Sequence, residues 1–126
     1  MRAFKTKWFG RFVRREGISD ASLREAIARA ERGIVDADLG GGLIKQRVAR
    51  QGQGRSGGFR TIIAYQTKRR AVFLYGFAKN ERDNISSAEL LSLRDVGQAW
   101  LAAGTSKILE ALVDGALQEI DDDQEN

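Results

Sequence analysis

Three groups of basic residues carry the strongest chemical signal in this sequence. Lys45 and Arg47 stand two residues apart in a stretch with strand character, so their side chains should share one face. Arg60 follows a glycine-rich stretch, and Lys79 and Arg82 belong to the first polar run after the most apolar segment. Cations in such places can hold a phosphate and stabilise the negative charge that develops on it during a reaction.

Each group also has a purely structural interpretation. Charges at Lys45 and Arg47 could protect an exposed edge strand from aggregation. Arg60 could hold the carbonyl groups of a neighbouring loop. The polar run could be a solvated turn in which Glu81 balances the charge of Arg82. The sequence alone leaves both interpretations open for each group.

The composition excludes several classes of catalytic site. The 126 residues include no His and no Cys, which rules out a histidine base, a thiol nucleophile, a disulfide and a thiolate zinc site. Asp36 and Asp38 flank Ala37, but no third ligand for a metal is in view. We therefore expect no metal and no cofactor, and any chemistry must come from Arg, Lys, Asp, Glu, Ser, Thr or Tyr.

The basic residues concentrate in one part of the chain. Residues 39–80 contain nine Lys or Arg and no Asp or Glu, whereas residues 108–126 contain seven Asp or Glu and no Lys or Arg. A block of one sign with aromatic residues between favours a polyanion-binding surface over a solvated basic face. We expect further RNA contacts from this block at Arg50, Arg55, Lys68, Arg69 and Arg70.

The length of the chain is typical of one domain. No stretch approaches the roughly 18 apolar residues of a membrane span. The basic segment 1–15 lacks the apolar run of a signal peptide, so we expect a cytoplasmic protein. A single domain is expected over residues 1–120, followed by an acidic, disordered tail at 121–126.

Helices are expected at both ends of the chain. Apolar residues at helical spacing predict a helix over 6–16 and a second one from Ser19 or Asp20 to Gly33. These two should form a hairpin, with contacts from Trp8, Phe12, Leu23 and Ile27. Ser86 and Glu89 fit a capping box that opens a third helix. A fourth, amphipathic helix is expected between Gly104 and Ile120.

The middle of the chain has the pattern of strands. Alternating and β-branched residues predict strands at 43–49, 59–66 and 71–78, besides a short edge strand at 1–5. The glycine-rich stretch 52–58 is expected to be a loop. The element order predicts an α+β domain in which a helical hairpin, an antiparallel sheet and C-terminal helices follow one another.

Three segments of the chain resemble the RelE/ParE toxin superfamily: Arg2–Thr6 (RAFKT), Gly57–Ala64 (GGFRTIIA) and above all Tyr75–Ile85 (YGFAKNERDNI). The closest branch is that of the HigB-like, RelE-type toxins of bacterial type II toxin–antitoxin systems. The resemblance covers residues 2–119 and implies the RelE-like fold, in which an N-terminal helical hairpin packs on a small twisted antiparallel sheet. It also implies partners: the ribosome, messenger RNA and a cognate antitoxin, a helix-turn-helix protein from an adjacent gene.

The resemblance implies roles for the basic residues. Nuclease members of this superfamily cut messenger RNA in the ribosomal decoding site without a metal, by attack of the RNA 2′-hydroxyl, leaving a 2′,3′-cyclic phosphate. By position, Arg60 resembles the arginine that stabilises the transition-state phosphate, Arg82 the arginine that assists the leaving group, and Lys79 its basic neighbour. Lys45 and Arg47 occupy the strand where these nucleases place lysines that bind RNA or act as the base.

A ribosome-dependent mRNA endoribonuclease that inhibits translation is therefore the leading expectation. Two other functions are open. ParE-like members inhibit DNA gyrase by binding it and lack such a basic cluster, and a non-catalytic nucleic-acid-binding module could share the fold. The sequence differs from the nucleases at Arg47, where a lysine would be a better base. It differs again at Ser86, where RelE has a tyrosine that orients the RNA.

Overall fold

A six-stranded sheet forms the centre of the protein. The computed structural model describes residues 1–50, 54–82 and 84–121, except for the side chains of residues 54–56. The strands of the sheet are β1 (Arg2–Thr6), β2 (Ala37–Gly40), β3 (Leu43–Arg50), β4 (Gly54–Gln66), β5 (Arg70–Ala78) and β6 (Leu117–Glu119). The helices are α1 (Lys7–Glu16), α2 (Asp20–Glu31), α3 (Ser87–Ala102) and α4 (Thr105–Asp114). The α+β class expected from the sequence is confirmed.

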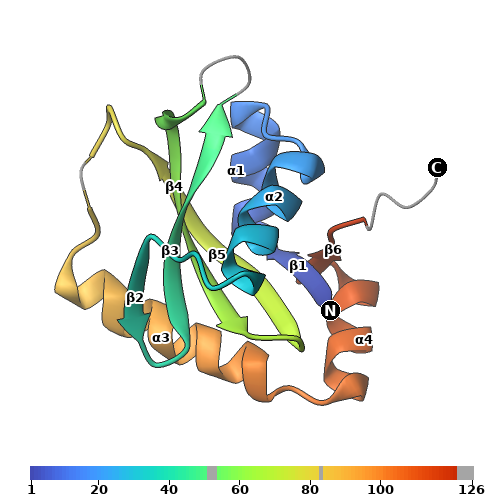
Figure 1. Ribbon diagram of the computed structural model, residues 1–126. Helices are drawn as coiled ribbons and strands as arrows, with labels where there is room; N and C mark the ends of the chain where they lie inside the picture. The colour runs from blue at the N-terminus through green and yellow to red at the C-terminus, as the bar shows by residue number, and fades with distance from the viewer. Residues whose placement is uncertain (51–53, 83, 122–126) are drawn as a thin grey trace.

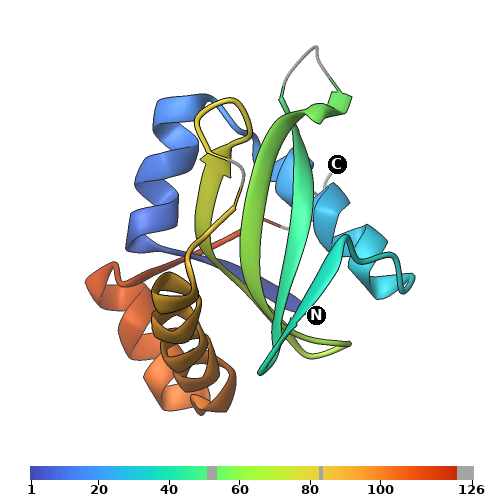
Figure 2. The same cartoon turned by 90° about the vertical axis from the view of Figure 1, so that its left-hand side faces the viewer.

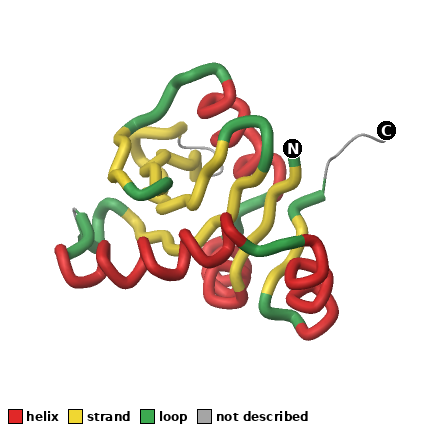
Figure 3. The backbone as a smooth tube through the Cα atoms, turned by 90° about the horizontal axis from the view of Figure 1, so that it is seen from below, coloured by secondary structure: helices red, strands yellow, loops and turns green. Residues whose placement is uncertain are grey.

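The helices cover the two faces of the sheet separately (Figures 1 and 2). On one face, α1 packs over β5 and α2 over β3, and Phe9, Leu23 and Phe73 belong to the apolar cluster between them. On the other face, α3 packs over β4 and β5, and the chain then turns into α4 (Figure 3). Ile62 and Leu74 belong to this second cluster, so β5 is covered on both faces, as its apolar sequence predicted.

The strand order differs from the expected antiparallel sheet. The order is β2-β3-β4-β5-β1-β6, and β1 pairs in parallel with β5, so the sheet is mixed. The prediction of an edge strand at residues 1–5 is wrong, because β6 pairs antiparallel with the other side of β1. Both pairings join distant parts of the chain, which a local pattern of apolar residues does not reveal.

The first two helices begin close to where the sequence predicted, and Ser19 is one of the two residues expected to cap the second. Thr6 accepts a hydrogen bond from the backbone of Phe9 at the start of α1, and Ser19 does the same for Ser22 in α2. Of the contacts expected of Trp8, the one with Phe12 is present within α1, where the two rings stack with centroids 5.6 Å apart. The ring of Trp8 also stacks on Tyr75 of β5, with centroids 4.6 Å apart, and it remains 38% exposed.

The glycine-rich stretch is largely strand. Residues 54–58 belong to β4, and Gly54 is in register with Arg50 of β3. A Cβ at Gly58 would lie 2.1 Å from the carbonyl oxygen of Val48, so only glycine lets the two strands approach here. The expected loop is therefore wrong for residues 54–58, and residues 51–53 lie outside the described chain. The short strand β2 was not expected either.

The C-terminal part ends differently from the sequence expectation. The capping box is confirmed: Ser86 accepts from the backbone of Glu89, whose carboxylate accepts from the backbone of Ser86. The helix expected up to Ile120 is wrong, because α4 ends at Asp114, is capped by Gly115 with φ 87°, and the chain continues as β6. Ile120 is buried and donates its backbone N–H to Ala3.

Asp121, the first residue of the expected tail, is hydrogen-bonded to the body of the protein. Its backbone N–H donates to Asp20 at 3.3 Å, and its carbonyl accepts from Arg24. Residues 122–126 lie outside the described chain. None of the helices in the described ranges is both long and apolar enough to cross a bilayer.

Candidate functional site

Strand register brings most of the expected catalytic residues to one face. Arg47 on β3 pairs with Arg60 on β4, which in turn pairs with Phe77 on β5. In the next row, Lys45 pairs with Ile62, which pairs with Tyr75. Ile62 and Tyr75 belong to the cluster under α3, so these rows lie on the α3 side of the sheet. The prediction that Lys45 and Arg47 share a face is confirmed.

Arg60 has one guanidinium nitrogen that lacks a hydrogen bond within the described residues. The side chain is partly buried, and its Nη1 is shielded from solvent without a hydrogen-bond partner within the described part of the chain. In the described residues, Nη1 therefore does not donate to a loop carbonyl, as the structural interpretation of Arg60 would require. A shielded donor without an acceptor is unfavourable, and an anion bound at this face would satisfy it.

Arg47 is held by Asp36, which precedes β2. The Asp36 carboxylate accepts from the backbone N–H of Arg47 at 2.6 Å and from its guanidinium at 3.2 Å. The carbonyl of Arg47 accepts from Arg29 on α2. The pairing between β2 and β3 stops at Lys45, so β2 offers no partner to the backbone of Arg47. The side chains of Asp36 and Arg29 satisfy the backbone N–H and carbonyl of Arg47 instead.

The same contacts set the ionisation of Asp36. Burial alone would raise the pKa of Asp36, but the hydrogen bonds from the backbone and guanidinium of Arg47 oppose it. Together with the positive charges of Arg47 and Arg29, they hold this pKa below its ordinary value. Arg29 itself is only 2% exposed and also pairs with Glu25 at 2.8 Å. Asp36 is therefore a carboxylate that anchors two arginines.

Arg82 is tied into the start of α3. Its Nη1 and Nη2 donate to the two carboxylate oxygens of Glu89 at 3.0 and 2.7 Å, and its Nε donates to the carbonyl of Asn84 at 2.8 Å. Its guanidinium also lies over the ring of Phe77, 5.6 Å from the centroid. The partner of Arg82 is thus Glu89 and not the Glu81 considered from the sequence.

Glu89 serves both the helix and the site. The hydrogen bonds from Arg82, joined by that from the backbone of Ser86, lower the pKa of Glu89 to about 2. The carboxylate is therefore ionised at neutral pH and fixes the Arg82 guanidinium beyond the end of β5. The sequence identified Glu89 only as a capping residue.

The two lysines of the expected site are less constrained. Lys45 is half-buried on β3, and Lys79 is exposed in the turn that follows β5. Among the described residues neither has an ion pair. Because Lys79 follows Ala78, which pairs with Phe59 beside Arg60, the turn lies at the same end of the sheet as Arg60.

The residues expected to make further RNA contacts are not gathered at this face. Arg50 lies over the ring of Phe59, which belongs to the α1–α2 side, and the side chain of Arg55 lies outside the described residues. Lys68, Arg69 and Arg70 lie at the β4–β5 turn, at the opposite end of the strands from Arg60. Arg69 and Arg70 donate to carbonyls at the end of α3, those of Trp100, Leu101 and Ala103.

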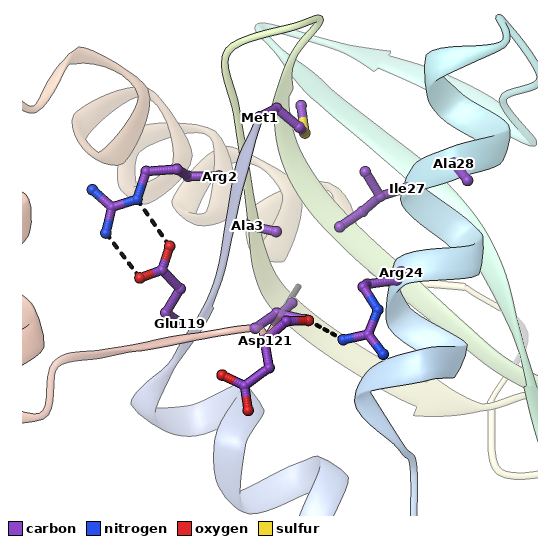
Figure 4. Close-up of a pocket in the computed structure, with 9 residues that line it drawn as sticks. Met1, Arg2, Ala3, Arg24, Ile27, Ala28, Glu119 and Asp121 are labelled. Carbon is purple, nitrogen blue, oxygen red and sulfur yellow. Dashed lines mark hydrogen bonds and ion pairs between the residues drawn. The ribbon is translucent and has the colours of Figure 1, made fainter. Parts of the chain in front are cut away.

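A pocket of about 600 Å³ lies away from these cations. It is formed by the start of β1, the α2 residues Arg24 and Ile27, and the chain after β6 (Figure 4). Arg2 and Glu119 form a two-fold hydrogen-bonded ion pair at its rim, at 2.9 and 2.8 Å. None of the cations expected to be catalytic lines this pocket, so its volume does not mark the chemistry expected from the sequence.

Sequence reasoning missed the side chains that hold the cations. Asp36 was considered only as a metal ligand, and Arg29 was not singled out because arginine is usually exposed. The spacing of Glu25 and Arg29, four residues apart on a helix, was the available local signal. Tyr75, whose hydroxyl accepts from Arg82 at 3.2 Å, carried no signal beyond its place in the apolar strand.

The comparisons with known proteins identify the family. No curated protein matches the sequence. The family model described as the RelE toxin of the RelE/RelB toxin–antitoxin system matches residues 1–120. This match spans the whole fold, the basic residues Lys45, Arg47 and Arg60, and the Arg82–Glu89 pair. The chain therefore belongs to the RelE toxin family of toxin–antitoxin systems.

Proposed function

We propose that this protein is a ribosome-dependent mRNA endoribonuclease that inhibits translation. RelE-family toxins are generally translation-dependent ribonucleases, and membership implies a cognate antitoxin. The observation that carries the proposal for this chain is Arg60, whose shielded Nη1 has no protein partner in the described chain and lies beside Arg47 in register. A scissile phosphate bound here would supply the missing acceptor.

The reaction that we propose is attack of the RNA 2′-hydroxyl on the adjacent phosphate. The bond from the 2′-oxygen to phosphorus forms, the bond from phosphorus to the 5′-oxygen breaks, and a 2′,3′-cyclic phosphate remains. The 2′-hydroxyl loses a proton and the leaving 5′-oxygen gains one. These steps need cations around the phosphate and groups that carry protons, but no metal ion.

We assign the roles by position on the α3 face. Arg60 stabilises the charge on the pentacoordinate phosphorus, and Arg82 assists the leaving oxygen from its place over Phe77. Lys45 and Lys79 are the amines at this face that can carry a proton. Arg47 binds phosphate rather than acting as the base, because its guanidinium is already paired with Asp36 and keeps its proton.

The finer classification follows from the sequence resemblance. We propose that the toxin belongs to the HigB-like branch, acts in the cytoplasm, and is neutralised by a helix-turn-helix antitoxin encoded next to it. The tyrosine that orients the RNA in RelE is replaced here by Ser86, which instead caps α3.

Primer extension on a reporter mRNA tests this function. The reporter is expressed with and without its start codon, after induction of the wild-type toxin, of Arg60→Gln, or of Arg11→Gln as a control on the exposed side of α1. We expect cuts within codons of the translated message only, by wild type and Arg11→Gln but not by Arg60→Gln. Intact mRNA with inhibited gyrase would instead support a ParE-like toxin. RNA binding without cuts would support a non-catalytic module.

A further inference from the structure

A second pocket, of about 330 Å³, lies next to the candidate cations. It opens between Tyr75 of β5 and the first two turns of α3, where Ala88, Glu89, Ser92 and Leu93 line it. Its lining is mostly carbon, with few polar atoms. None of the roles assigned above to the cations involves this pocket.

The aromatic wall of the pocket is held in place from two sides. The ring of Trp8 stacks on that of Tyr75 at 4.6 Å between centroids, with an interplanar angle of 27°. The Tyr75 hydroxyl accepts a hydrogen bond from Nη1 of Arg82 at 3.2 Å. A wall that is already fixed loses little conformational entropy when a ligand binds against it.

The pocket shares two of its lining residues with the network around Arg82. Glu89 binds Arg82 through both carboxylate oxygens, and Arg82 lies over Phe77, the register partner of Arg60. An apolar, aromatic pocket thus adjoins a group of cations within one continuous face. That combination fits a ligand that is anionic at one end and flat and aromatic at the other.

We infer that this pocket binds a nucleobase of the RNA substrate, next to the phosphate held by Arg60 and Arg82. The inference rests on the proposed nuclease function and adds a base-binding site to it. The base packs between Tyr75 and Leu93, and stacking on an aromatic side chain is the usual way proteins hold unpaired bases. The cations beside the pocket favour a nucleotide over a purely aliphatic ligand.

Two polar groups in the lining can bind the edge of the base. The Ser92 hydroxyl can donate or accept. On Glu89, Oε1 already accepts from Arg82 and from the backbone of Ser86, whereas Oε2 accepts only from Arg82 among the described residues. Oε2 therefore keeps a lone pair for an N–H of the base, so the pocket contributes to the choice of codon.

Fluorescence of Trp8 tests binding without relying on cleavage. The protein has two tryptophans, so Trp100→Phe leaves Trp8 as the only one, stacked on the wall of the pocket. The probe is a 2′-O-methyl RNA trinucleotide, which lacks the attacking hydroxyl. We expect it to change the Trp8 emission, and Ser92→Leu, which fills the pocket, to weaken binding about tenfold, the effect of one lost stacking contact.

The matched control is Ala99→Leu, two helical turns further along α3, where the side chain is exposed and outside the pocket. It should bind the trinucleotide as the parent does. If Ser92→Leu lowers the melting temperature, Ala88→Leu is used in its place, because it fills the pocket from the first turn of α3. Equal affinity in both pocket variants and the control would overturn the inference. So would weakened binding of the antitoxin with unchanged RNA binding, because the pocket would then be a protein-docking site.

Cleavage of a reporter mRNA separates this inference from the proposed function. If wild type cuts no translated message, the nuclease function fails, while trinucleotide binding that Ser92→Leu weakens would still support a base-binding pocket. If wild type cuts, Ser92→Leu should cut at least about fivefold more slowly and with a changed codon profile. An unchanged rate and codon profile in Ser92→Leu would remove the pocket and leave the nuclease function intact.

Discussion

Asp36 holds Arg47 by both its backbone and its side chain. One carboxylate oxygen accepts from the backbone N–H at 2.6 Å and the other from the guanidinium at 3.2 Å. With Arg29 bound to the carbonyl of Arg47, an ion pair replaces the strand that is missing beside this residue. These contacts hold the edge of β3 at the point where it presents a cation to the α3 face.

Asp36→Ala should destabilise the fold. The change removes a partner of Arg29, which is 2% exposed, and leaves the backbone N–H of Arg47 without its acceptor. We expect a loss of about 2–3 kcal/mol in the free energy of unfolding, measured by urea denaturation. Asp95→Ala, on the exposed side of α3, is the control and should change it by less than about 0.5 kcal/mol. Equal losses in the two variants would show that the network around Asp36 contributes nothing.

Arg60→Gln should separate activity from stability. Nη1 of Arg60 has no hydrogen bond to lose within the described chain, so the melting temperature should stay the same or rise. Loss of a transition-state cation should lower the cleavage rate about 10²–10³-fold. Melting curves and a single-turnover cleavage assay on programmed ribosomes measure both. A variant that cleaves normally, or one that unfolds, would contradict the role given to Arg60.

Glu89 should make the start of α3 sensitive to acid. Its pKa is lowered from an ordinary 4.5 to about 2, so the ionised carboxylate stabilises the folded state fully above pH 4.5. This contribution is lost as the pH falls from 4.5 towards 2. The difference in melting temperature between wild type and Glu89→Gln should therefore be largest at neutral pH and shrink over that range. A difference that grows with acidification would mean that the carboxylate is not stabilised by Arg82.

Binding of RNA should depend on salt through a few residues only. Arg47 is already paired with Asp36 and Arg82 with Glu89, so neither adds a net positive charge for the phosphates. If Lys45, Arg60 and Lys79 each neutralise one phosphate, the logarithm of the association constant should fall with the logarithm of salt concentration with a slope of about −2. Lys45→Ala combined with Lys79→Ala should reduce the slope to about −0.7. Lys68→Ala tests the RNA contact expected from the sequence at the β4–β5 turn. An unchanged slope in that variant would limit binding to the α3 face.

Local signals in the sequence were enough to predict where three of the helices begin. Ser19 and the pair Ser86 and Glu89 were predicted as caps and are confirmed. The helix expected over 6–16 begins at Lys7, and Thr6 is its cap. The strand that Gly115 separates from α4 was missed, because Leu117 and Ile120 continue a helical stripe. Only the pairing with β1 shows that Leu117 belongs to a strand and that Ile120 directly follows it. Both side chains are buried there.

The candidate site could be predicted only in part, because local patterns place residues within one strand but do not show which strands pair. The period of a strand places Lys45 and Arg47 on one face, but the pairing of Arg47 with Arg60 depends on the register between strands. The partners Asp36 and Glu89 lie eleven and seven residues from the arginines they hold, in different elements. Whether a cation is paired or available to a ligand therefore follows only from the three-dimensional structure.

A single 2′-deoxy substitution in the message tests the proposed chemistry most directly. Ribosomes are programmed with an mRNA whose decoded codon carries either a 2′-hydroxyl or a 2′-deoxy sugar at the cleaved position, and the wild-type toxin is added. We expect the all-ribose codon to be cut, leaving a 2′,3′-cyclic phosphate and a 5′-hydroxyl, and the 2′-deoxy codon to remain intact. Cleavage of the 2′-deoxy message, or a 3′-hydroxyl on the upstream product, would contradict attack by the RNA's own hydroxyl.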